Sequence, residues 1–387
     1  MTLSNSGGNS ITESNRPGLS MKCVSFPFSH KANPLTATLP KDPISLMQLG
    51  LVGLLEVSSL WLFLASPTLG QITPDNTLGD ENSIVTPNQT IRGAVADLIE
   101  GGAIRDSNLF QSFLEFNVGN GQRVYFANPD GITNILTRVT GSNLSQILGT
   151  LGVNGSANLF LLNPNGINFG ANSRLDVAGS FFASTADSAM FDNGFNFSAS
   201  DPNAPPLLTI NIPMGLQYGS NPGPVNVIGA TLGIETGQTM ALLGGQVNLN
   251  SATLQVPGGR VELGGLSSSG TVTLNGGTSV SFPDGVQPAN VSLSNGSLVD
   301  VTSVNGGTIA INSANFDMSQ SSLQAGLTSG ASIPDAVAGN ITINAKGNTN
   351  LSDLSLIAND IVSSAIGNGG NIQLSTSALT ITGGDRK

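Results

Sequence analysis

The chain has 387 residues, a formal net charge of −11 and a sequence pI near 4.3. Only 10% of the residues are charged, whereas 49 are glycine. A chain this acidic lacks the basic clusters that bind phosphate, so we expect no nucleic-acid partner. Because Glu, Lys and Arg are scarce, long amphipathic helices are disfavoured, and the composition indicates short β-strands joined by tight turns.

Residues 1–70 are predicted to form a removable leader. An apolar run from Leu46 to Ala65 follows a segment with three lysines, and small residues precede Gln71. This order is typical of a secretory signal, with cleavage expected between Gly70 and Gln71. The alternative is an uncleaved membrane anchor, which Glu56 near the middle of the run disfavours.

The only cysteine, histidine and tryptophan are Cys23, His30 and Trp61, and all three lie in the predicted leader. After cleavage the chain would contain neither cysteine nor histidine. We therefore expect no disulfide, no Cys/His metal site and no catalytic cysteine or histidine. The same reasoning predicts no cofactor.

Two similar segments stand 35 positions apart, each an apolar run followed by Asn-Pro-x-Gly and an isoleucine. The corners are Asn128-Pro129-Asp130-Gly131, before Ile132, and Asn163-Pro164-Asn165-Gly166, before Ile167. Asparagine first, proline second and glycine fourth suit a type I turn. We expect each isoleucine to begin the next strand.

A looser repeat follows, in which a glycine precedes an alternating apolar and polar segment. The glycines are Gly307, Gly339 and Gly370, spaced by 32 and 31 residues, with similar segments after Gly245, Gly259 and Gly270. This pattern indicates half-buried strands entered through turns, and irregular periods of this size favour a solenoid. We predict an all-β parallel β-helix of about 13–15 coils, at roughly 20–25 residues per coil. An array of β-sandwiches is the alternative.

From Ile72 to about Phe191 the chain resembles the secretion domain of filamentous-haemagglutinin-type exoproteins, the exported partners of two-partner secretion. The resemblance rests on several blocks: Gln71–Gly79, Ile91–Ala94, Gly101–Arg105, the signature residues Asn108, Leu109, Phe110, Ser112, Phe113 and Phe116, the two Asn-Pro corners, and Leu175–Ser184. Asn163–Ile167 is the family motif Asn-Pro-Asn-Gly-Ile intact. The chain departs from the family at Asp130 and Gly131, where relatives usually have Asn-Leu, and at Gln111, where many have histidine.

The resemblance implies a right-handed β-helix and three segments: a leader (1–70), a two-partner-secretion domain (71–240) and a β-helical repeat region (241–387). It also implies a partner, an outer-membrane barrel transporter with POTRA domains that the chain crosses unfolded before folding outside. We therefore expect a secreted or cell-surface protein, exported through the periplasm and outer membrane, that acts as an adhesin on a surface glycan or protein. The chain ends soon after a repeat begins, so we also expect a truncated or split gene product.

Two other functions stay open, a carbohydrate-active β-helix enzyme and a purely structural surface protein. The enzyme would need clustered acids, whereas Asp176, Asp187, Asp192 and Asp201 are loosely spaced. We favour no enzymatic activity. For Asn163–Ile167 we favour a turn that holds the corner over a direct transporter contact. For Asn108–Val118 we favour core positions over a docking surface.

Overall fold

The computed structural model describes residues 71–207, 212–276, 279–329, 336–362 and 365–383. All regular elements within these ranges are β-strands, and they belong to one compact unit, Ala65–Lys387. No helix in the described ranges is long and apolar enough to span a membrane. The predicted leader of residues 1–70 lies outside the described residues, so it stays a prediction.

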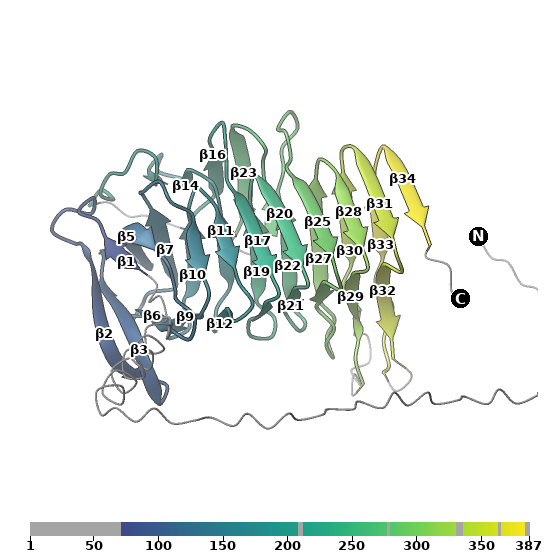
Figure 1. Cartoon of the computed structure of the whole chain (residues 1–387), viewed down its shortest axis with the longest axis horizontal. Coiled ribbons are helices and arrows are strands. Elements are labelled where there is room, and N and C mark those ends of the chain that lie inside the picture. Colours follow the sequence, from purple (N-terminus) through teal and green to yellow (C-terminus); the bar gives the residue numbers. More distant parts are fainter. Residues whose placement is uncertain (1–70, 208–211, 277–278, 330–335, 363–364, 384–387) are drawn as a thin grey trace, which may run out of the picture. The chain divides into compact units, whose positions relative to one another are not determined.

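The largest sheet, here the first sheet, receives one strand from each coil of the chain (Figure 1). From β5 to β33 all neighbouring strands are parallel, whereas β1 and β4 pair with β5 antiparallel. Its strands are β1 (Ile72–Pro74), β4 (Ala103–Arg105), β5 (Asn108–Phe116), β7 (Asn134–Val139), β10 (Asn158–Leu162), β13 (Phe181–Ser184), β19 (Thr239–Leu243), β22 (Arg260–Gly264), β27 (Thr308–Ser313), β30 (Ile341–Ala345) and β33 (Ile372–Ser375).

Between visits to the first sheet the chain passes through two other faces. The second sheet is parallel throughout: β8 (Ser145–Ile147), β11 (Ile167–Phe169), β17 (Pro224–Ile228), β20 (Gln246–Asn250), β25 (Asn290–Ser294), β28 (Phe316–Ser319), β31 (Asn348–Ser352) and β34 (Ala378–Thr382). The remaining strands of the coils form two smaller sheets: β2 (Ser83–Ile91), β3 (Ala94–Gly101), β6 (Arg123–Ala127), β9 (Thr150–Asn154) and β12 (Arg174–Asp176), then β18 (Thr231–Gly233), β21 (Thr253–Gln255), β26 (Leu298–Asp300), β29 (Ser322–Leu327) and β32 (Leu356–Ile361). This succession of parallel faces is a parallel β-helix, so the predicted fold class is confirmed.

The coils are fewer than predicted. The parallel strands of the first sheet from β5 to β33 number nine, not 13–15. The estimate was wrong because it assigned every residue after Gln71 to a coil. Two excursions instead build an antiparallel sheet, here the outer layer: β14 (Ser188–Met190), β15 (Asn196–Ser198), β16 (Gly215–Tyr218), β23 (Gly270–Asn275) and β24 (Ser279–Ser281).

From β7 to β22 the first sheet is buried on both faces. Its inward positions form registered columns in the interior, such as Leu109, Ile135, Leu159 and Phe181 in β5, β7, β10 and β13. Its outward positions, among them Phe110 and Phe160, pack in a second core against the outer layer. Each fully buried apolar side chain of this kind contributes about 2 kcal/mol, and this burial is what holds the coils together.

The looser glycine repeat is explained in part by stacking. Gly259, Gly307, Gly339 and Gly370 precede β22, β27, β30 and β33, and they lie above one another so closely that a Cβ on Gly339 would meet the Gly307 carbonyl oxygen at 2.0 Å. Gly245, Gly259 and Gly270, however, lead into three different sheets through β20, β22 and β23. Their similarity therefore does not mark equivalent rungs.

Strand β19 continues through residue 240, and the parallel pairing is unbroken from β13 to β22. The division into 71–240 and 241–387 stays a prediction.

Candidate functional site

The signature segment β5 lies in the first parallel coil and is paired with the N-terminal strands β1 and β4 (Figure 1). Leu109, Phe113 and Phe116 belong to the interior core, and Phe110 belongs to the core beneath the outer layer. All four are at most 1% exposed. These four apolar positions therefore lie in the core, whereas Leu114 of the same segment is exposed.

Asn108, also in the signature, begins a ladder of side-chain amides on the first sheet. Asn134 donates from Nδ2 to Oδ1 of Asn108 at 3.0 Å, and Asn158 donates in the same way to Asn134 at 2.9 Å. The ladder ends where the backbone N–H of Ser180 donates to Oδ1 of Asn158. Because Asn108 and Asn134 are buried, these bonds satisfy amides that would otherwise destabilise the fold. The ladder ties the first coils together.

The Asn163–Ile167 corner forms the predicted turn. The N–H of Gly166 donates to the carbonyl of Asn163 at 3.1 Å, and Ile167 begins β11. The fully buried Asn163 side chain donates to the carbonyl of Asn143 and to Oγ of Ser145, both at 3.0 Å. Its Oδ1 accepts from the backbone N–H of Asn165. The asparagine therefore fixes its own turn and joins it to the preceding coil.

The Asn128–Gly131 corner differs from the prediction by one residue. Its turn bond runs from the N–H of Ile132 to the carbonyl of Pro129, and Gly131 has a φ of +82°. The glycine therefore takes the third position of its turn, where a positive φ is required, as in type II turns, rather than the fourth position of a type I turn. Ile132 does not begin a strand, because β7 starts at Asn134. The prediction of two equivalent corners is wrong here.

Asn128 nevertheless joins neighbouring coils. Its Oδ1 accepts from the backbone N–H groups of Ser156 and Ala157, both at 2.9 Å, and its Nδ2 donates to the carbonyl of Ile132. Both corner asparagines thus act as connectors between segments of adjacent coils, although their turns differ.

A buried arginine that the sequence reasoning missed organises the N-terminal cap, the region of β1–β5. Arg138, in β7 and fully buried, donates to Oγ of Ser112 at 2.9 Å and to Oγ1 of Thr77 at 2.7 Å. It also donates to the backbone carbonyls of Ser198, the last residue of β15, and of Asn203. Burial lowers the pKa of Arg138 to about 10, while the nearby Asp75 favours the charged form. Arg138 therefore stays charged at neutral pH and connects the cap, the second coil and the outer layer.

Asp75 is the acidic counterpart of Arg138. Its carboxylate accepts from Thr77, from Oγ of Ser112 at 2.9 Å and from Oγ1 of Thr140 at 2.5 Å. Burial raises the pKa of Asp75, but these hydrogen bonds outweigh burial and bring the pKa below its usual value of 3.8. One feature of the sequence indicates this pair. Arg138 stands within the mainly apolar segment Asn134–Val139, in a chain with very few cations.

A second arginine repeats the arrangement at the edge of the cap. Arg105 makes a bidentate ion pair with Glu81, at 3.0 and 2.7 Å, and donates to the carbonyls of Pro205 and Pro206. The residues between β15 and β16 are thus fastened to the cap at two places.

The intact corner also forms part of an open groove of about 920 Å³. Pro164 and Asn165 line it together with Gln71 at the predicted mature start and Leu114 and Glu115 of β5. Leu114 is 48% exposed, unlike its neighbours in the signature. Three of the blocks that carry the family resemblance therefore meet at one surface.

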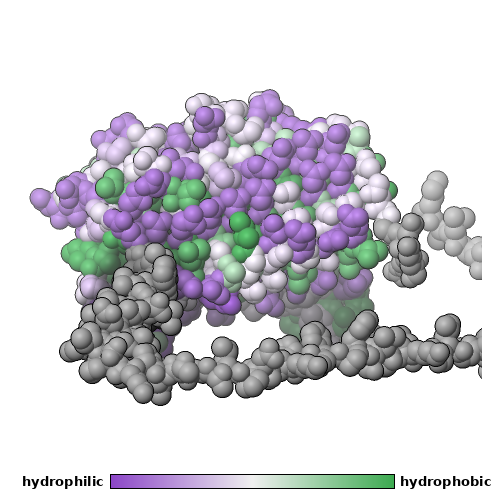
Figure 2. Space-filling model, in the orientation of Figure 1, coloured by the Kyte–Doolittle hydropathy of each residue, from purple (hydrophilic) through white to green (hydrophobic). Residues whose placement is uncertain are grey.

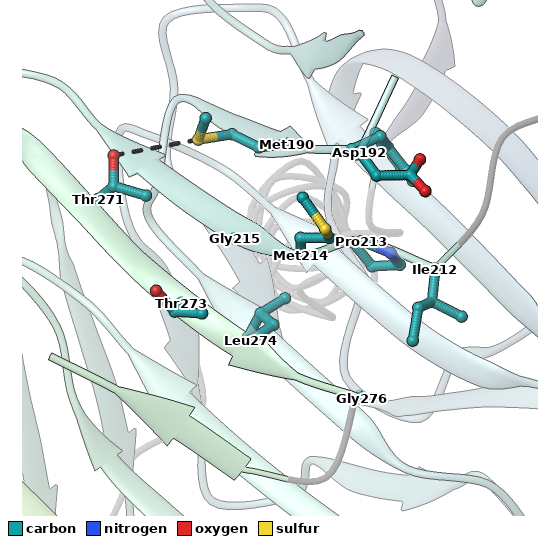
Figure 3. A pocket seen from close by; sticks show the side chains of 11 residues that line it. Met190, Asp192, Ile212, Pro213, Met214, Gly215, Thr271, Thr273, Leu274 and Gly276 are labelled. Carbon is teal, nitrogen blue, oxygen red and sulfur yellow. Dashed lines mark hydrogen bonds between the residues drawn. The ribbon is translucent and has the colours of Figure 1, made fainter. Parts of the chain in front are cut away.

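A mainly apolar cavity of about 480 Å³ lies in the outer layer (Figure 3). Met190, Met214 and Leu274 line it, and Oγ1 of Thr271 donates to the Met190 sulfur at 4.0 Å. Asp192, one of the acids considered above, also lines it, whereas none of the signature or corner residues does.

The predicted acidic residues are not brought together as a catalytic set. Asp176 pairs with Arg92 and accepts from the Tyr125 hydroxyl, whereas Asp187 accepts from Ser200 in the outer layer. Within the described ranges, no group of three or more His, Cys, Asp or Glu side chains is placed to hold a metal ion. The chemistry at the cap and corners is hydrogen bonding and charge pairing that connect successive coils.

Residues 70–313, more than half of the chain, match the protein family described as TPS secretion domain. A 72-residue stretch, 19% of this chain, is 42% identical to the heme/hemopexin-binding protein of Haemophilus influenzae and covers 8% of that protein. The chain therefore spans less than a tenth of the curated relative that it matches.

Two solved structures are similar to this chain at low sequence identity. The HMW1 secretion domain from Haemophilus influenzae is 18% identical, with a TM-score of 0.41, over 83% of this chain and 76% of that one. The filamentous hemagglutinin secretion domain is 14% identical, with a TM-score of 0.40, over 80% of this chain and 99% of that one.

Proposed function

Because this chain belongs to the family of TPS secretion domains, we propose that it is the exported partner of a two-partner secretion system. Its transporter is then a cognate outer-membrane barrel with POTRA domains, and the chain ends on the cell surface or in the medium. The observation that carries this proposal is the family match over residues 70–313, which includes the cap, both Asn-Pro corners and the first coils.

The composition of the chain supports passage through a pore before folding. The only cysteine is Cys23, so no disulfide can lock the chain before it is threaded. Within the parallel sheets each coil pairs only with the coil before and the coil after it, so the β-helix can form one coil at a time as the chain emerges. The apolar burial gained with each coil opposes movement back into the pore.

The cap and corners are the parts best suited to start this process. Arg138 joins elements that span residues 77–203, and Asn163 joins its turn to residues 143–145. We propose that the corner motif acts in export chiefly by building these coils. The groove beside Pro164 and Asn165 is the alternative place for direct contact with the transporter.

After export, the chain presents a long β-helical surface, and hydrophilic side chains predominate on the face seen in Figure 2. We propose a non-enzymatic surface role, with adhesion to a glycan or protein as the specific function. The ligand named for the Haemophilus relative is not carried over, since the shared 72 residues are only 8% of that protein.

The test is transporter dependence. The full chain is produced in a Gram-negative host with or without a cognate barrel transporter, and the amount outside the cells is measured by immunoblotting. We expect the chain outside only when the transporter is present. Equal external amounts in both hosts, with the periplasm intact, would contradict the proposal.

A further inference from the structure

A cavity of about 320 Å³ lies where the loop after β24 meets the ends of β27, β30 and β33. This volume is within the range of about 300–1,000 Å³ for small-ligand sites. The cavity is far along the chain from the cap and uses none of the residues assigned to export. Its walls combine one cation, several amides and hydroxyls, and one aromatic ring.

The cation is Lys346, which is the only lysine in the described ranges. Its Nζ donates to the carbonyl of Val286 at 2.8 Å, which leaves two of its three N–H groups for another acceptor. No Asp or Glu is among the described residues that line the cavity, although Asp284 lies in the same loop. In a chain of net charge −11, this cavity is therefore a local site for a negative group.

A second feature is a column of polar side chains on one face of the first sheet. Asn312, Asn344 and Ser375 are register partners in β27, β30 and β33, and all three line the cavity. Ser375 is exposed, so its hydroxyl is open to a ligand in the cavity.

The amides of two neighbouring coils complete the polar wall. Asn344 donates from Nδ2 to Oδ1 of Asn312 at 3.1 Å, so Nδ2 of Asn312 and Oδ1 of Asn344 are left to donate to and accept from a ligand. On the other side, the partly buried Phe282 supplies an apolar wall. An inorganic anion would not use this ring, and a neutral sugar would not need the lysine.

We propose that this cavity binds one acidic sugar residue, with its carboxylate on Lys346, its hydroxyls on Ser375 and the two asparagines, and the C–H face of its ring against Phe282. The site is independent of the export route, because it belongs to the folded coils. Its failure would leave the secretion proposal untouched.

The test uses the purified full chain and a panel of soluble probes: D-glucuronate, D-galacturonate and N-acetylneuraminate, each beside its methyl ester. Binding is measured by isothermal titration calorimetry at low and high salt. We expect saturable binding of at least one acid, at least tenfold weaker binding of its ester, and weakening by salt.

Lys346→Gln should weaken binding at least tenfold, and Phe282→Leu severalfold, with the melting temperature unchanged. The matched control is Arg174→Gln, which removes a cation elsewhere on the coils and should bind as the parent chain does. Absence of saturable binding by every acid, equal binding of acid and ester, or unchanged binding by the folded Lys346→Gln chain would each overturn the proposal.

Discussion

The guanidinium of Arg138 lies 4.3 Å from the ring centroid of Phe197, which joins the second coil to an outer-layer strand almost sixty positions later. The same guanidinium reaches Thr77 near the start of the predicted mature chain. One side chain thus holds three segments that are distant in sequence. This arrangement makes the N-terminal cap a cooperative unit rather than a frayed solenoid end.

Replacement of Arg138 should therefore destabilise the protein strongly. Arg138→Ala removes the cation near Asp75 and the donor to the carbonyls of Ser198 and Asn203, so we expect a loss of about 3–5 kcal/mol in the free energy of unfolding. Urea denaturation followed by circular dichroism measures it. Arg174→Ala is the control, since Arg174 is exposed, and should change stability by no more than about 0.5 kcal/mol. Similar losses in both variants would contradict the role of Arg138 in connecting the cap, the second coil and the outer layer.

The low pKa of Asp75 makes stability depend on pH in a defined direction. Because the pKa in the folded state lies below the usual 3.8, the contribution of Asp75 is full above that value and is lost as the pH falls through the folded-state pKa. Asp75→Asn should thus lower the urea midpoint at neutral pH and lower it less at about pH 3. An equal loss at both pH values would show that the charge of Asp75 is not what stabilises the cap.

The stacked glycines give a test of the coil spacing. Gly339→Ala would place a Cβ 2.0 Å from the carbonyl oxygen of Gly307, so the coils must separate, at a cost of about 3 kcal/mol or more. Gly369→Ala is the matched control, because a Cβ there meets nothing within 4 Å. Thermal melting should show a large shift for the first variant and little for the second. Equal shifts of the melting temperature in the two variants would mean that the coils are not spaced as described.

The corner variants separate folding from transporter contact. Asn163→Ala removes the hydrogen bonds of a buried side chain and should cost about 2–3 kcal/mol, with a fall in the exported amount. Asn165→Ala changes the exposed neighbour that lines the groove and should affect both quantities much less. Export is read from the external fraction, and stability from the purified chains. If Asn165→Ala abolished export without loss of stability, the corner would instead be a transporter contact.

The fold class and the intact corner could be predicted because they depend on local patterns. Alternation after glycine marks strands wherever they occur, and Asn163-Pro-Asn-Gly specifies its turn within four residues. The number of coils could not be predicted, because the outer-layer strands carry the same pattern as coil strands: Gly270 leads into β23 as Gly259 leads into β22. Only long-range pairing tells the two apart.

The sequence did not predict the turn at Gly131 or the contacts of Arg138, and the reasons differ. At Gly131 the sequence allowed a glycine at the third or the fourth turn position, and the tertiary structure selected the third. Arg138 appears from sequence as a polar interruption of a strand, and its partners Thr77 and Asn203 lie more than sixty residues away on either side. No local pattern records such contacts.

The central claim is that the chain passes the outer membrane through a cognate transporter and forms its coils outside. Its most direct measurement compares the protease resistance of the chain in the external fraction of cells with the transporter and in the periplasm of cells without it. We predict a resistant external chain, with the fragments of a folded β-helix, and a periplasmic chain that is rapidly degraded. A periplasmic chain that is equally resistant and is still exported when the transporter is supplied would contradict the account.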